Sequence, residues 1–102
     1  MTPEKQRIAI ADACGIVTHD QWGPLYRTPQ GLVRVCPDFL NDLNAMHEAE
    51  KVVIERGENA MLDYDQELSI MTDSWKWNAT AAQRASAFLE TLGLWEEAKN
   101  ES

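Results

Sequence analysis

Residues 25–35 of this chain read LYRTPQGLVRV, and this stretch decides the fold class. Two short apolar runs flank the segment TPQG at residues 28–31, in which proline and glycine occupy positions that a hairpin loop favours. The pattern predicts a β-hairpin with strands over residues 25–27 and 32–35. The fold should therefore contain a sheet as well as helices.

Two further segments have strand character. The β-branched run IVTH at residues 16–19 precedes the hairpin and is separated from it by a break at Gly23-Pro24. The segment WKW at residues 75–77 alternates as a short edge strand does. We expect these segments to complete a small, largely antiparallel sheet.

Capping residues mark the first and the last helix. Thr2 and Pro3 are suited to the N-cap and first helical positions, and Gly15 is suited to the left-handed position that ends a helix. Near the other end of the chain, Thr80 and Gln83 have capping-box spacing, and a helix from there should stop at Gly93. These signals predict helices over residues 3–14 and 80–92.

The clearest helix is predicted from Asp38 to Arg56, before Gly57. Its apolar residues recur at steps of three and four, which places them on one buried face. These residues are Phe39, Leu43, Met46, Ala49 and Val53. Residues 58–71 fit both a helix and a strand, and we prefer a helix.

Together these elements predict one α/β (α+β) domain over residues 1–95, arranged as a layered helix–sheet–helix sandwich with about four helices. A chain of 102 residues suffices for one modest core. Residues 96–102 have little to bury and should form a frayed acidic tail.

The composition excludes several classes of protein. Seventeen acidic residues against nine basic ones give a net charge of −8, which argues against direct binding to nucleic acid or to an anionic membrane. No apolar run approaches the roughly 20 residues that span a bilayer. The opening residues lack the layout of a signal peptide, so we expect the protein in the cytoplasm, with Cys14 and Cys36 reduced.

No candidate chemical site has the spacing that its chemistry needs. The segment HEAEK at residues 47–51 begins like a zinc-binding helix, but Lys51 stands where the second histidine must be. The alternating carboxylates of Asp63, Asp65 and Glu67 would point one way only on a strand, so a helix leaves them as a solvated acidic face. The soft metal ligands follow no compact metal-binding spacing; they are Cys14, His19, Cys36 and His47. We predict no catalytic residue, no metal and no cofactor.

The aromatic content is the more informative feature. A chain this short cannot bury four tryptophans completely, and exposed tryptophan and tyrosine beside arginine are typical of binding surfaces. The competing interpretation is that these rings fill the core, because tryptophan is usually well buried. The predicted ligand- or partner-binding residues are Trp22, Tyr26, Arg34, Trp75 and Trp77.

Three segments resemble the phage ABA sandwich domain family, a family of small proteins encoded by phages and prophages. They are TPEKQRIAIADACG at residues 2–15, PDFLNDLNAMHEAEK at residues 37–51 and ATAAQRASAFLETLGLW at residues 79–95. The resemblance implies a helix–sheet–helix layered fold and a phage origin. It implies no catalytic residues, because the family has no assigned activity.

We therefore expect a non-enzymatic phage accessory protein that acts in the host bacterial cytoplasm. In the first hypothesis it modulates or inhibits a host process, such as a defence complex, by binding a host protein. In the alternative, it is a homo-oligomeric sponge that sequesters a nucleotide-like small molecule between aromatic rings and arginines. An uncharacterised enzyme is the third reading. The exposed apolar hairpin and the tryptophan-bearing edge strand expected at residues 75–77 also suggest a homodimer.

Overall fold

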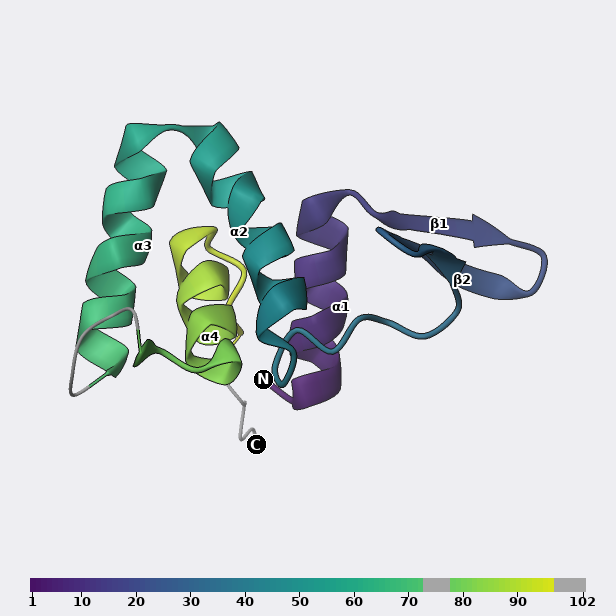
Figure 1. The fold of residues 1–102 in the computed structure, drawn as a ribbon, viewed down its shortest axis with the longest axis horizontal. Coiled ribbons are helices and arrows are strands. Elements are labelled where there is room, and N and C mark those ends of the chain that lie inside the picture. Colours follow the sequence, from purple (N-terminus) through teal and green to yellow (C-terminus); the bar gives the residue numbers. More distant parts are fainter. Residues whose placement is uncertain (73–77, 97–102) are drawn as a thin grey trace.

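The computed structural model describes residues 1–72 and 78–96 (Figure 1). Within these residues there are four helices and one three-stranded sheet. They are α1 (Pro3–Cys14), β1 (Val17–Asp20), β2 (Gly23–Thr28), β3 (Gly31–Val33), α2 (Leu43–Arg56), α3 (Glu58–Met71) and α4 (Ala81–Thr91). The predicted mixed α+β fold, with helix, sheet and helices in that order along the chain, is confirmed. The predicted strand at residues 75–77 and the tail from residue 97 lie outside the described residues.

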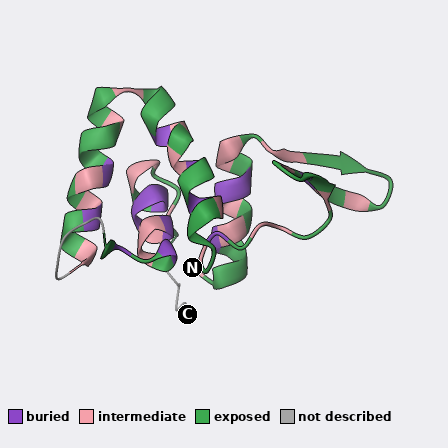
Figure 2. Cartoon of the chain, viewed as in Figure 1, coloured by how far each residue is buried: buried purple, intermediate pink, exposed green. Residues whose placement is uncertain are grey.

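The four helices pack against one another and enclose the core. Figure 2 shows the buried residues on the facing sides of the helices. The largest side chains that solvent does not reach are Ile10, Met46, Val53, Phe88 and Leu89. No helix within the described ranges is long and apolar enough to cross a membrane.

The sheet is antiparallel throughout, in the order β1-β2-β3. Val17 lies opposite Tyr26 in the first pair, and Tyr26 lies opposite Val33 in the second. Only 7% of Tyr26 is exposed, and its ring belongs to the core. Figure 1 shows the turn between β1 and β2 pointing away from the helices, so the sheet extends from the helical body on the side of α1.

The chain enters the sheet through the cap of α1. Thr2 accepts a hydrogen bond from the Lys5 backbone, as predicted. Gly15 takes a positive φ of 68°, and two bonds close the helix end: Gly15 N–H to the Asp12 carbonyl and Ile16 N–H to the Ala11 carbonyl. A residue with a Cβ would be strained at this φ, so glycine is what lets the chain turn from α1 directly into β1.

The predicted start of α2 is wrong, because the helix begins at Leu43 and not at Asp38. The Asp42 side chain caps the helix by accepting from the backbone N–H groups of Asn44 and Ala45. Asp38 forms a separate turn with Asn41. Leu43 therefore falls in the first helical turn and is 41% exposed, so its predicted place in the core is also wrong. Phe39 is buried as expected, but from a turn.

The two later helices agree with prediction. Residues 58–71 form α3, which settles the choice between helix and strand in favour of the helix. The Thr80–Gln83 capping box is present at the start of α4. At its end Leu94 N–H bonds the Leu89 carbonyl at 2.8 Å, and Gly93 has a φ of 71°. This is the predicted glycine cap.

Candidate functional site

The structure separates the predicted binding residues. Trp22 and Arg34 lie together at the outer end of the sheet, whereas Tyr26 packs into the core. Burial raises the pKa of Tyr26, and the neighbouring Cys36 adds to the shift. Trp75 and Trp77 lie outside the described residues. Within the described residues, the predicted patch therefore reduces to Trp22 and Arg34.

These two residues join Asp20 in a group that we call the tip cluster (Asp20, Trp22 and Arg34). The Arg34 guanidinium carbon lies 5.8 Å from the centroid of the Trp22 ring, within cation–π range. An Arg34 terminal nitrogen (Nη2) donates to Asp20 Oδ2 at 2.5 Å, and the Trp22 backbone N–H donates to Asp20 Oδ1 at 2.8 Å. One carboxylate thus fixes both the turn that carries Trp22 and the arginine beside the ring.

The tip cluster is open to solvent. Trp22 is 73% exposed, which is unusual for so large an apolar side chain. The hydrogen bond from Arg34 and the one from the Trp22 backbone lower the pKa of Asp20. The carboxylate is therefore ionised at neutral pH and keeps its partners. Leu32 on β3 and Val35 just after it are also exposed, at 62% and 78%, but Leu32 lies opposite Arg27, toward the other end of the sheet.

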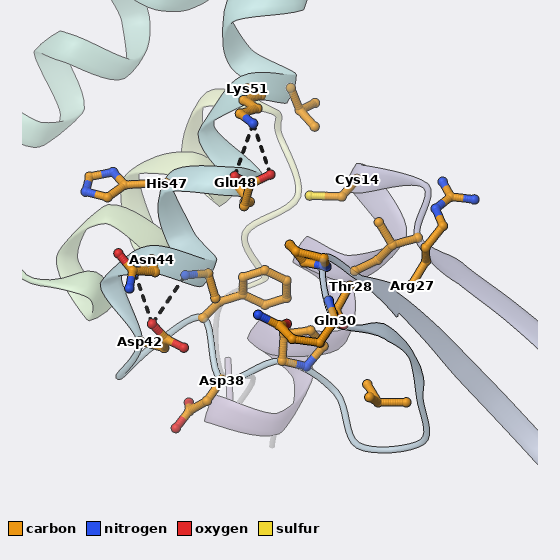
Figure 3. Close-up of a pocket in the computed structure, with 18 of the residues that line it drawn as sticks. Cys14, Arg27, Thr28, Gln30, Asp38, Asp42, Asn44, His47, Glu48 and Lys51 are labelled. Atoms are coloured by element: carbon orange, nitrogen blue, oxygen red, sulfur yellow. Dashed lines mark hydrogen bonds and ion pairs between the residues drawn. The ribbon is translucent and has the colours of Figure 1, made fainter.

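A cleft between the β2–β3 turn and α2 is a second candidate site, which sequence reasoning missed. Its volume is about 720 Å³. Figure 3 shows Thr28 and Gln30 on the sheet side, with Glu48 and Lys51 on the side of α2. Its apolar lining comes from Ile16, Val33, Val35, Pro37, Phe39 and Val52. Residues from three separate segments meet here, so no local pattern marks the cleft.

The charged lining of the cleft is predominantly acidic. Arg27 and Lys51 are its fixed cations, and Lys51 is already paired with Glu48 at 3.1 Å. The carboxylates that line the cleft are those of Asp38, Asp42, Glu48 and Glu55. Such a lining favours a cationic or neutral occupant over an anionic one.

Cys14 also lines the cleft, and Figure 3 shows its sulfur on the cleft side of α1. Burial raises the pKa of this thiol to about 11. Because the thiolate is the nucleophilic form, a raised pKa makes the residue inert at neutral pH. Cys14 and Cys36 are both free thiols in the structure.

A polar network joins three helices on the other side of α2. Glu50 accepts a hydrogen bond from the Tyr64 hydroxyl and one from Arg84 Nη1 at 2.9 Å, and its other oxygen contacts His47 Nδ1 at 2.8 Å. Arg84 Nε also donates to the Ala79 carbonyl at 3.1 Å. The Glu50 and Arg84 side chains are only 14% and 12% exposed. The network holds α2, α3 and α4 together from within.

Electrostatics in this network follow from its geometry. Burial alone would raise the pKa of Glu50, but the hydrogen bonds from Tyr64, His47 and Arg84 outweigh it and hold the pKa below its usual range. Burial and the adjacent carboxylate raise the pKa of Tyr64 far above its usual range. The network is therefore a carboxylate with neutral tyrosine and charged arginine partners. A groove of about 190 Å³ adjoins it.

The segment HEAEK at residues 47–51 forms ion pairs of its own. His47 contacts Glu50, and Lys51 pairs with Glu48, so these four side chains are paired within the segment that begins like a zinc-binding helix. Among the residues that the structure describes, no group of three or more histidine, cysteine, aspartate or glutamate side chains is placed to hold a metal ion.

Comparison of the chain with protein-family models, curated proteins and solved structures finds no match. The resemblance to the phage ABA sandwich domain family stays a prediction.

Proposed function

We propose that this chain is a non-enzymatic binding protein that docks on another protein through the tip cluster. One observation carries the proposal: a 73% exposed tryptophan lies beside an arginine that an aspartate holds in place. Tryptophan and arginine are the residue types most enriched among side chains that dominate binding energy. A solvent-facing pair of this kind has no role in the core.

The tip cluster is organised before any partner binds. Asp20 accepts from the Trp22 backbone and from Arg34, so the turn and the guanidinium are both held in one arrangement. Binding then costs less conformational entropy than it would with mobile side chains. The arrangement fits a contact whose centre is the Trp22 ring.

The resemblance to phage-encoded proteins supports a host protein as the partner. In this proposal the chain acts in the bacterial cytoplasm as an accessory factor that modulates or inhibits a host process, such as a defence complex, without a cofactor. Its charge of −8 disfavours nucleic acid as the partner.

A small-molecule carrier is the second candidate, and the cleft favours it. A volume of about 720 Å³ lies within the range of ligand pockets, roughly 300–1,000 Å³. However, four carboxylates line the cleft against two fixed cations, which disfavours the nucleotide-like ligand of the sponge hypothesis. A carrier function would instead require a cationic or neutral molecule.

The test is affinity capture from host lysate, followed by measurement of the dissociation constant for the captured protein. Trp22→Ala should weaken binding by about 30-fold or more, as expected for a central interface tryptophan. Ile70→Ala is the matched control, because Ile70 is similarly exposed at 76% but lies on α3. Asp65→Asn, on the same helix, should also bind normally.

The result would contradict the proposal if Trp22→Ala bound the partner as wild type does. Loss of binding with Asp65→Asn alone would shift the site to the acidic surface. A small molecule that copurifies, and whose binding is lost on Phe39→Ala but kept on Trp22→Ala, would favour the carrier function.

A further inference from the structure

Within the residues that the structure describes, the outer edge of β1 has no neighbouring strand. The Arg27 N–H donates to the Ile16 carbonyl at 2.9 Å, which places Ile16 and Arg27 at a hydrogen-bonded position of the ladder. Hydrogen-bonded and non-hydrogen-bonded pairs alternate along an antiparallel ladder. Thr18 and Asp20 therefore bond inward to β2, whereas the backbone groups of Val17 and His19 point outward.

Nothing in the described part of the chain takes up these outward groups. Beyond the sheet ladder, no backbone hydrogen bond reaches Val17 or His19. Natural edge strands are usually blocked by lysine, proline or a bulge, and β1 (VTHD) has none of these. Figure 1 shows β1 along the margin of the sheet, on the part that extends from the helical body. The edge can accept another strand.

The charge distribution favours a second copy of the chain as that strand. Residues 16–36 contain one acidic residue, Asp20, and two basic residues, Arg27 and Arg34, so they carry a net charge of +1. The remainder of the chain carries −9. Two copies of an acidic protein repel each other least where their sheets meet.

The strand is also complementary to itself. Pairing two copies of β1 antiparallel about Thr18 places Val17 of each copy opposite His19 of the other. These are the residues with outward backbone groups, so the register forms four hydrogen bonds. Thr18 then faces its own counterpart in a non-hydrogen-bonded pair, and threonine pairs are favourable there. No like charges lie directly opposite.

We propose that the protein forms a two-fold symmetric dimer in which two β1 strands pair antiparallel about Thr18 and join the sheets into one of six strands. This goes beyond the proposed function, because it concerns the β1 edge and needs no host partner. The contact is isologous, so it closes at two copies and does not polymerise.

Proline at position 19 tests the edge selectively. The His19 N–H points outward, so His19→Pro removes two of the four intermolecular bonds and leaves the bonds to β2 in place. We expect the dimer dissociation constant to rise by at least about tenfold in sedimentation equilibrium. His19→Thr keeps the N–H and is the matched control, which should dimerise as wild type does.

A cross-link tests the register without relying on the proline variant. Directly opposed residues of a non-hydrogen-bonded pair have Cα atoms about 4.5 Å apart, which a disulfide can bridge. Thr18→Cys should therefore give a covalent dimer under mild oxidation, whereas wild type and Leu32→Cys, on the β3 edge, should not.

A wild-type protein that stays monomeric from micromolar to submillimolar concentration would overturn the inference. So would a dimer that Thr18→Cys does not trap, or one that Leu32→Cys traps instead. Failure of Trp22→Ala to affect capture of a host partner would refute the proposed function and leave the dimer standing.

Discussion

The polar network around Glu50 predicts that replacing Glu50 or Glu48, both on α2, will change the free energy of unfolding by very different amounts. Replacing Glu50 with alanine removes the carboxylate that Arg84, 12% exposed, contacts at 2.9 Å and that the Tyr64 hydroxyl donates to. Removing one member of a buried ion pair typically costs about 3–5 kcal/mol. Arg84 keeps its bond to the Ala79 carbonyl, so we expect a value near the lower end, about 3 kcal/mol.

Glu48 is the matched control for this prediction. It lies on the same helix and pairs with Lys51, but these side chains are 54% and 64% exposed. Exposed pairs of this kind contribute about 0.5 kcal/mol or less, so Glu48→Ala should leave the stability nearly unchanged. Urea unfolding followed by circular dichroism would measure both variants, with an unchanged slope against urea showing that the comparison is valid.

The same network predicts an acid dependence with a definite sign. The pKa of Glu50 is lowered in the folded protein, so its contribution is present above the unfolded-state pKa, about 4.3, and is lost as the pH falls through the lowered value. The stability difference between wild type and Glu50→Gln should therefore shrink on acidification. A Glu50→Ala cost below about 1 kcal/mol, or one equal to that of Glu48→Ala, would refute this account of the network.

Three further predictions concern the core, the titration of Tyr64 and the thiols. Phe88→Ala should lower the free energy of unfolding by about 3–5 kcal/mol, because solvent does not reach the ring. Leu43→Ala, at 41% exposure, should lower it by about 1 kcal/mol in the same urea assay. Equal costs would contradict the observed start of α2. Because the pKa of Tyr64 is raised in the folded protein, the free energy of unfolding should fall as the pH rises above about 10, where tyrosine ionises only in the unfolded chain. A Tyr64→Phe variant that loses stability just as steeply would show that Tyr64 is not responsible. Burial raises the pKa of the Cys14 thiol to about 11, so its alkylation at pH 8 should be slow in the folded protein. In the denatured protein, Cys14 and Cys36 should both be alkylated without reductant. A disulfide detected by intact mass would argue against a reducing compartment.

Much of the fold could be predicted because its signals are local. The caps at Thr2, Gly15 and Gly93 act on backbone groups within a few residues, so the sequence around each cap contains the whole interaction. The hairpin turn is similar, since the Thr28 hydroxyl bonds Gly31 and Gln30 within the loop itself. Such signals are read correctly from the chain alone.

The start of α2 shows where prediction from local sequence fails. Phe39 and Leu43 have helical spacing, yet Asp42 between them caps the helix and leaves Phe39 in a preceding turn. A periodic pattern does not distinguish a buried turn residue from a helical one, because both place an apolar side chain against the core. Local competition for backbone N–H groups decided the boundary.

The sequence alone determined the class of the fold and its caps, and it named Trp22 as one of five candidate binding residues. Only the tertiary structure placed Arg34 beside that ring and separated Tyr26 from it, and only there do Glu50, Tyr64 and Arg84 meet. The reason is distance along the chain. A cap is complete within one turn of backbone, whereas a cleft, a buried ion pair or a sheet edge exists only after elements tens of residues apart have packed.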